Sequence, residues 1–163
     1  MNNITGKCAR KVPVRPIEDI SILLAFDYGK RRLGVAVGQM VTGTATPLTT
    51  LQRRANRTDW AAIAALVQTW KPDAMVVGLP HGIHDDTHEI KAAIAAFRRQ
   101  LEVRFELPVY TADEAYTSTE AYAHLKERRR AQNDGKRIQK DEIDCLAAAI
   151  LLEAWMSAHR TDI

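Results

Sequence analysis

The sequence contains little cysteine and no long apolar stretch, and both absences limit the kinds of protein that it can encode. Only two of its 163 residues are cysteine, Cys8 and Cys145, and they do not form a CxxC pair. A disulfide framework or a zinc knuckle is therefore disfavoured, and a reducing cytoplasm is the expected compartment. No apolar run approaches the ~20 residues of a membrane-spanning helix, so we expect no membrane partner.

A strong charge of one sign is also lacking. Lys and Arg number 23 against 20 Asp and Glu, and the formal net charge is +3. This balance alone is weak support for a nucleic-acid partner. The basic residues are nevertheless clustered, in the segments 30–32, 53–57, 98–99 and 128–137. Such clusters can follow a phosphate backbone, although a charge run more often forms a solvated face.

The length and the 46% hydrophobic content are those of one globular domain with a substantial core. Residues 1–20 contain Pro13 and Pro16, lack the apolar core of a signal peptide and show no clear periodicity. We therefore predict a flexible N-terminal tail over residues 1–20 and a single domain over residues 21–163.

Strand-like and helix-like segments alternate along the rest of the chain. Residues 22–38 form two apolar runs around a Gly-containing turn, which predicts a β-hairpin. Residues 74–79 are a continuous apolar run, typical of a strand buried on both faces. Further expected elements are strands at 43–51 and 107–111 and helices starting at 58–59, running through 90–101, starting at the Thr117–Glu120 capping box, and spanning 140–158. This order predicts a three-layer α/β domain with a mixed central sheet and helices on both faces.

The helix that begins at Thr58-Asp59 and ends at Pro72 carries apolar residues at helical spacing. We expect this stripe to pack in the core against the sheet. Its members are Trp60, Ile63, Val67 and Trp70.

Three acidic residues stand where an expected element begins or ends. Asp27 closes the first hairpin strand, Glu114 follows the strand at 107–111, and Asp144 lies near the start of the last helix. Sites in α/β sheets gather outside the carboxyl ends of strands, and converging carboxylates need protons or cations between them. Taken singly, Asp27 could cap its turn, Glu114 could cap a helix and Asp144 could pair with Lys140. Taken together, they favour a site for Mg²⁺ or Mn²⁺, which prefer oxygen ligands and can serve phosphodiester hydrolysis.

Four stretches in order, LLAFDYGKRRLGVAVG, VVGLP, DEAYTSTEA and KDEIDCLAAAILLE, resemble the YqgF family. The resemblance extends over residues 23–155. It implies an RNase H-like fold and a nuclease that resolves Holliday junctions or, in bacteria, acts on precursor 16S rRNA. It also implies that Asp27, Glu114 and Asp144 are the catalytic residues and bind two metal ions.

The chain departs from the family pattern at two places. Ala115 stands where the family usually has Arg after its Asp-Glu pair, which removes a partner for a phosphate or carboxylate. Residues 140–142 replace a KGK-like turn with Lys-Asp-Glu, which makes the rim of the site more acidic.

Basic residues beside the acids are the expected substrate contacts. These are Lys30, Arg31 and Arg32 on the hairpin turn, and Lys140 at the start of the last helix. The histidines of the loop at 81–88 could suggest a zinc cluster, but no Cys or fourth ligand is evident nearby. We interpret this stretch as a polar loop near the site.

We therefore expect a cytoplasmic metal-dependent endonuclease, a monomer or homodimer, that hydrolyses structured nucleic acid and processes the 5′ end of pre-16S rRNA. A four-way DNA junction is the alternative substrate and would favour a dimer. A non-catalytic RNA-binding or transcription-associated module is the second alternative. An Asp-x-Gly hairpin is also typical of actin-like ATPases and sugar kinases, but those need two such domains and this chain supplies one.

Overall fold

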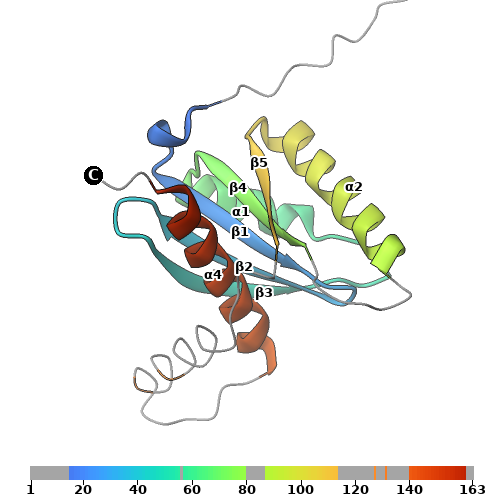
Figure 1. The fold of residues 1–163 in the computed structure, drawn as a ribbon. Helices are drawn as coiled ribbons and strands as arrows, with labels where there is room; N and C mark the ends of the chain where they lie inside the picture. Colours follow the sequence, from blue (N-terminus) through green and yellow to red (C-terminus); the bar gives the residue numbers. More distant parts are fainter. Residues whose placement is uncertain are drawn as a thin grey trace, which may run out of the picture.

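The structure is a computed structural model, and it describes residues 15–55, 57–79, 87–113, 127, 131 and 140–160. Five strands form one sheet in the order β3-β2-β1-β4-β5 (Figure 1). Strands β1, β2 and β3 are antiparallel neighbours, whereas β4 and β5 run parallel to β1. The sheet is thus mixed, as predicted. The strands are β1 (Ile22–Tyr28), β2 (Arg32–Gln39), β3 (Thr44–Gln52), β4 (Ala74–Leu79) and β5 (Val109–Asp113).

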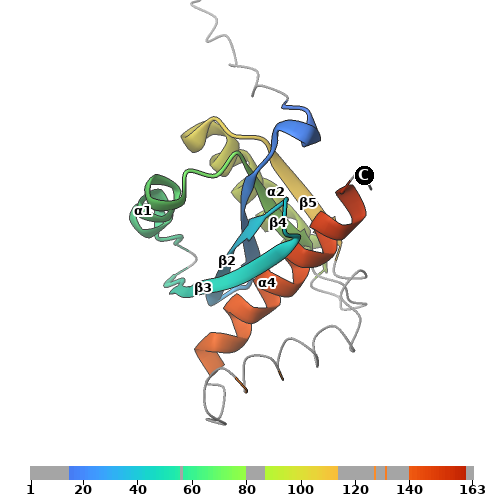
Figure 2. The same ribbon diagram turned by 90° about the vertical axis from the view of Figure 1, so that its left-hand side faces the viewer.

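Helices cover both faces of the sheet, which confirms the predicted three-layer architecture. Helices α1 (Trp60–Trp70) and α2 (Thr87–Phe105) lie on one face, and α4 (Lys140–His159) lies on the other (Figure 2). A short 3₁₀ turn, η1 (Ile17–Asp19), precedes β1. The helix predicted from the capping box at 117–120 and the polar loop at 81–86 lie outside the described residues. Within the part of the chain that is described, no helix is long and apolar enough to span a membrane.

Alternation along β1 divides the apolar core into two layers. Leu23 and Ala25 point toward α4, and Leu24 and Phe26 point toward α1 and α2. All four side chains are fully buried, and burial of each large one stabilises the fold by about 2 kcal/mol. The α4 layer contains many alanines, which let the helix approach the sheet closely.

Helix α1 begins and ends where its sequence signals predict. The Asp59 side chain accepts a hydrogen bond from the backbone N–H of Ala62 (3.1 Å) and caps the first turn. Lys71 ends the helix in the left-handed conformation, with φ of 47°, before Pro72.

The predicted core stripe of α1 is only partly correct. Ile63 is fully buried and Val67 packs at the border of the core, but Trp70 is 37% exposed. Trp60 packs on Phe97 of α2, with ring centroids 5.6 Å apart. Trp70 is the last residue of the helix and does not belong to the apolar cluster, so the prediction that it packs in the core is wrong.

Strand β3 is an edge strand, and it contains Pro47. Pro47 pairs with Ala36 next to an irregularity in the β2–β3 register between Val35 and Ala36. Proline is tolerated there because an edge strand can lose a ladder hydrogen bond on its open side.

Residues 15–20, part of the predicted N-terminal tail, pack on the domain. The Asp73 carboxylate accepts hydrogen bonds from the backbone N–H groups of Ser21 (2.9 Å) and Ile22 (3.0 Å). It also forms an ion pair with Arg15 at 2.9 Å, and Ile20 is buried. These contacts fix the point where the chain enters β1.

Helix α4 touches the backbone of β2 at Gly34. A Cβ atom on Gly34 would overlap the carbonyl oxygen of Asp144 and would lie 2.9 Å from the backbone nitrogen of Cys145. Only glycine therefore permits this approach between helix and strand.

Replacing Gly34 by alanine should force the first turns of α4 away from β2. Because backbone atoms cannot yield as a flexible side chain can, we expect a loss of about 1–3 kcal/mol in the free energy of unfolding. Urea unfolding measures this loss. The exposed Thr46→Ala variant in the same sheet is the control and should change stability by less than about 0.5 kcal/mol. An unchanged midpoint for Gly34→Ala would contradict the close backbone contact.

Candidate active site

Asp27 is the penultimate residue of β1 and has a glycine beside it on each neighbouring strand. Its register partners are Gly34 of β2 and Gly78 of β4. Paired residues on adjacent strands point to the same face, so the half-buried Asp27 side chain lies on the α4 face, in line with Leu23 and Ala25. Neither register partner carries a side chain at this row of the sheet.

The contact between α4 and Gly34 brings Asp144 to this position. Since the backbone of Asp144 packs on Gly34, and Gly34 is the direct partner of Asp27, the Asp144 backbone and the Asp27 side chain lie on the same face of the sheet. They come from opposite ends of the sequence, one from a strand and one from a helix. That Asp27 and Asp144 belong to one catalytic site stays a prediction.

The Asp144 carboxylate is half-buried and incompletely satisfied. Its Oδ2 atom lies 3.3 Å from Nε of Arg32, and both side chains are about one-third exposed, at 30% and 31%. The same oxygen is screened from solvent and accepts no hydrogen bond from any described residue. The two groups thus form an ion pair without hydrogen-bond geometry.

Glu114, the third predicted acid, lies outside the described residues. Strand β5 ends at Asp113, directly before it. Strands β1, β4 and β5 are parallel, so their carboxyl ends lie at the same edge of the sheet (Figure 1).

The residues present fit a divalent cation. A screened carboxylate oxygen without a hydrogen bond is costly unless a cation satisfies it, and Arg32 does so only at ion-pair distance. Carboxylate oxygens are the ligands that Mg²⁺ and Mn²⁺ prefer. Among the described residues, no three potential metal-ligating side chains gather in one place, which leaves Asp27 and Asp144 as the described part of the predicted set.

The predicted basic residues divide into two groups. Lys30 and Arg31 are exposed on the turn between β1 and β2, whereas Arg32 is half-buried and pairs with Asp144. The side chain of Lys140 lies outside the described part of the chain, and so does its suggested pairing with Asp144.

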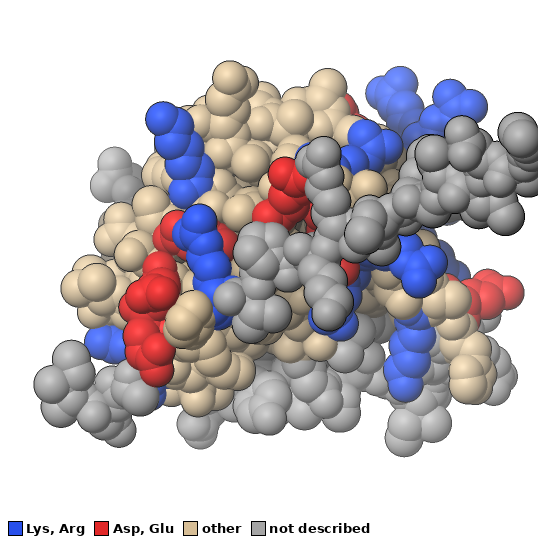
Figure 3. Space-filling view, turned by 90° about the horizontal axis from the view of Figure 1, so that it is seen from above, with Lys and Arg blue, Asp and Glu red and all other residues tan. Residues whose placement is uncertain are grey.

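Charges elsewhere on the molecule are mixed. The edge that carries η1 and the start of β1 shows Lys and Arg interspersed with Asp and Glu (Figure 3). This edge lies opposite the carboxyl ends of the parallel strands, and the described residues visible on it carry both signs of charge.

Arg53 is a residue that sequence reasoning missed, because it appeared only as a member of a basic cluster. Its guanidinium donates hydrogen bonds to the carbonyl oxygens of Gly29 (2.9 Å) and Lys30 (3.3 Å) and lies 4.3 Å from the centre of the Tyr28 ring. Its backbone N–H donates to Arg31 at 2.7 Å. Arg53 thus fixes the turn that carries Lys30 and Arg31. The one available signal was its position at the end of β3, beside the start of β2.

The Arg32–Asp144 pair can be tested without a substrate. In a double-mutant cycle with Arg32→Gln and Asp144→Asn, we expect a coupling of about 0.5 kcal/mol in the free energy of unfolding, because the pair is partly exposed. The coupling should shrink in high salt.

Arg98→Gln combined with Asp144→Asn is the control for this cycle. Arg98 lies on α2, across the sheet from α4, so these two changes should be additive. Additivity of the Arg32 and Asp144 changes as well would show that the ion pair contributes nothing.

The family model and the similar sequences indicate the same protein family. The sequence model of the RuvX family, described as Holliday junction resolvase, matches residues 21–158. A protein of Pseudomonas putida named "Putative pre-16S rRNA nuclease" is 43% identical over 142 residues, which cover 86% of this chain and 98% of the relative. The protein of the same name from Methylococcus capsulatus is 46% identical over 137 residues, which cover 84% and 89%.

Solved structures support the RNase H-like fold. RuvC of T. thermophilus, in complex with a Holliday junction substrate, superposes with a TM-score of 0.57 at 14% identity and covers 85% of this chain and 96% of its own. The fowlpox virus resolvase, in complex with Holliday junction DNA, gives a TM-score of 0.53 at 12% identity, with 86% and 99% covered. Identities this low show the fold alone. With the match of the family model and the identity to its relatives, they confirm both the predicted fold and the YqgF resemblance. The chain belongs to the RuvX (YqgF) family of Holliday junction resolvases and is a nuclease with a RuvC-like RNase H fold.

Proposed function

We propose that this nuclease is a divalent-metal-dependent endonuclease that processes the 5′ end of precursor 16S rRNA. The observation that supports the proposal is the approach of the Asp144 backbone to Gly34, the register partner of Asp27, on the α4 face of the sheet. The names of the relatives from Pseudomonas putida and Methylococcus capsulatus support precursor 16S rRNA as the substrate.

Asp27, Asp144 and Glu114 would hold Mg²⁺ or Mn²⁺ in this proposal. When bound, such ions supply Lewis acidity and a nucleophile at neutral pH for phosphodiester hydrolysis. Asp27 and Asp144 are held on regular elements, β1 and α4, so their carboxylates are oriented before substrate binds. Arg32 balances the charge of Asp144, which reduces the repulsion between the two acids.

Basic residues beside these acids would bind the substrate backbone. Lys30 and Arg31 are exposed on a turn that Arg53 fixes, at the edge where β1 ends. Lys140 begins α4, four residues before Asp144. Phosphate contacts of this kind position the substrate but carry no sequence information.

A four-way DNA junction is the second candidate substrate, because the matching family model is described as Holliday junction resolvase. A resolvase must cut two strands symmetrically, which favours a dimer. Offering the precursor 16S leader RNA and a four-way DNA junction to the same preparation distinguishes the two. Binding of the RNA without cleavage of either substrate would favour the non-catalytic alternative.

Replacing Asp27 by asparagine should reduce cleavage of the leader RNA by more than about a hundredfold, since a neutral amide is a poor ligand for a hard cation. The fold should persist, because an amide of the same shape removes a charge from a half-buried site. Cleavage assays with Mg²⁺ or Mn²⁺ and circular dichroism measure the two effects.

Asp19→Asn is the matched control for Asp27→Asn. Asp19 is exposed in η1, at the opposite end of β1, and its replacement should leave the rate unchanged. Chelation of divalent cations should stop the wild-type reaction, and added Mn²⁺ should restore it. Persistence of full activity in Asp27→Asn, or in the chelated protein, would overturn the proposed site.

Substrate affinity should depend steeply on salt. If Lys30 and Arg31 each neutralise one phosphate, replacing either by alanine should make the negative slope of log affinity against log salt less steep by about 1. Titration of Asp27→Asn with labelled leader RNA at several salt concentrations gives these slopes. An unchanged slope in both variants would show that the turn does not touch the phosphate backbone.

A further inference from the structure

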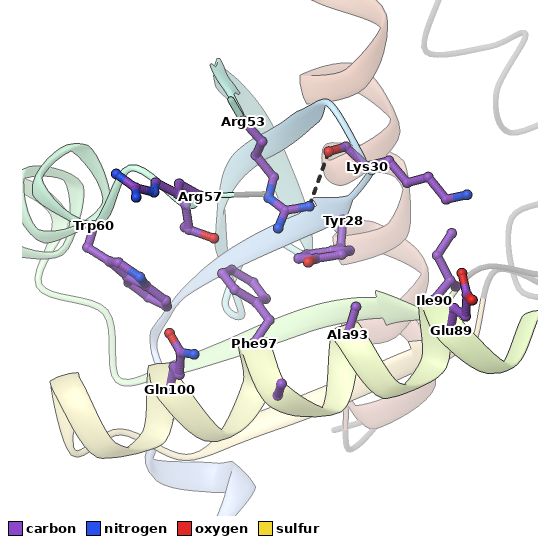
Figure 4. A pocket seen from close by; sticks show the side chains of 12 residues that line it. Tyr28, Lys30, Arg53, Arg57, Trp60, Glu89, Ile90, Ala93, Phe97 and Gln100 are labelled. Atoms are coloured by element: carbon purple, nitrogen blue, oxygen red, sulfur yellow. Dashed lines mark hydrogen bonds between the residues drawn. The ribbon is translucent and has the colours of Figure 1, made fainter. Parts of the chain in front are cut away.

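A pocket of about 770 Å³ lies on the face of the sheet opposite Asp144. Its walls come from the end of β1, the segment between β3 and α1, and the inward side of α2 (Figure 4). We call it the Tyr28 pocket. Its lining consists of Tyr28, Lys30, Arg53, Arg57, Thr58, Trp60, Glu89, Ile90, Ala93, Ala96, Phe97 and Gln100.

The floor of the Tyr28 pocket is apolar and held rigidly. Phe97 is buried, with its ring centroid 5.1 Å from that of Tyr28 and 5.6 Å from that of Trp60. Arg104 lies over the Trp60 ring at 4.3 Å. Because each ring already has partners, the floor is formed before any ligand arrives.

The rim of the pocket is basic. Lys30, Arg53 and Arg57 line it against one carboxylate, Glu89. In Figure 4, the guanidinium of Arg53 lies above Tyr28, between Arg57 and Lys30. Its hydrogen bonds to the turn carbonyls hold this cation in place. An apolar floor under a cationic rim suits a ligand that is planar and apolar at one end and anionic at the other.

The Tyr28 pocket and the proposed cleavage site share one end of β1. Asp27 and Tyr28 are consecutive strand residues, so their side chains point to opposite faces. Lys30 stands on the turn that joins the two sides and lines the pocket itself. A nucleic-acid strand that crosses this edge therefore passes from Asp27 to the pocket along a basic turn.

We propose that the Tyr28 pocket binds one unpaired nucleotide of the substrate RNA, its base on the apolar floor and its phosphate at the basic rim. The proposal rests on the proposed function, because it assigns the bound strand to the nuclease substrate. The pocket volume lies within the range of about 300–1,000 Å³ that small-molecule sites occupy. The Thr58 hydroxyl and the Gln100 amide offer donors and acceptors for a base edge. An unpaired base enters such a pocket without the cost of breaking a base pair.

Two substitutions test the pocket, each with a matched control. Ala96→Trp fills the pocket from an exposed position on α2. Ala95→Trp adds the same bulk at the preceding residue, which is also exposed but does not line the pocket. Arg57→Gln removes a rim charge, and Arg54→Gln removes a neighbouring exposed charge outside the lining.

All four changes are made in the full chain carrying Asp27→Asn, and binding is followed by fluorescence anisotropy. The probes are a labelled RNA hairpin with a single-stranded 5′ tail and the same hairpin with a blunt end. We expect Ala96→Trp and Arg57→Gln to weaken binding of the tailed hairpin roughly tenfold, with the blunt hairpin unaffected. The control variants should bind both probes as the parent does.

Equal affinity of Ala96→Trp and Ala95→Trp for the tailed hairpin would overturn the proposal, and so would an equal loss for both hairpins. Competition with free adenosine monophosphate distinguishes a pocket for a nucleotide of the bound strand from a pocket for a free nucleotide. If the free nucleotide displaces the tailed hairpin, the pocket takes a nucleotide of the strand. If it binds in the pocket without affecting the tail, the pocket serves a free nucleotide and the proposal fails. Binding is read without cleavage, so the result stands whether or not the leader RNA is cut.

Discussion

The contact between the backbone of α4 and Gly34 is the constraint on which the candidate site depends. A helix normally stands off a sheet by the thickness of the side chains between them, but Gly34 removes that spacer at the row that contains Asp27. Gly78 removes it on the other side of Asp27, where Leu151 of α4 comes close. Asp27 is thus the one residue in this row of three that carries a side chain, and the helix delivers Asp144 to it.

Acids placed on one face of the sheet lower the stability of the fold but suit the binding of a cation. Two carboxylates on one face repel each other, and a screened oxygen without a hydrogen bond raises the free energy of the folded state. Arg32 offsets part of this cost from the neighbouring strand. In the proposed metal site, acids held by β1 and α4 before a cation arrives would lose little on binding one, which is the pre-organisation that hydrolytic metal sites need.

The end of β1 also carries neighbouring side chains on both faces of the sheet. Alternation sends Asp27 toward α4 and Tyr28 toward α1 and α2, and the following turn is bound to the end of β3 through Arg53. A rigid turn keeps Lys30 and Arg31 in a fixed relation to both faces. The same edge of the sheet therefore presents acids on one side and a cationic, apolar pocket on the other.

The sequence by itself determined these elements, because their signals are local: the hairpin around its Gly-containing turn, the Asp59 cap of α1 and the buried run of β4. It also identified Asp27 and Asp144 as candidates, from their positions at element ends and from the family resemblance. Packing decided the rest. The exposure of Trp70, the pairing of Arg32 with Asp144, the role of Arg53 and the Tyr28 pocket all depend on which residues face each other across layers. Sequence spacing within one element carries no information about such contacts, and only the tertiary structure, through the approach of α4 to Gly34, places Asp144 beside Asp27.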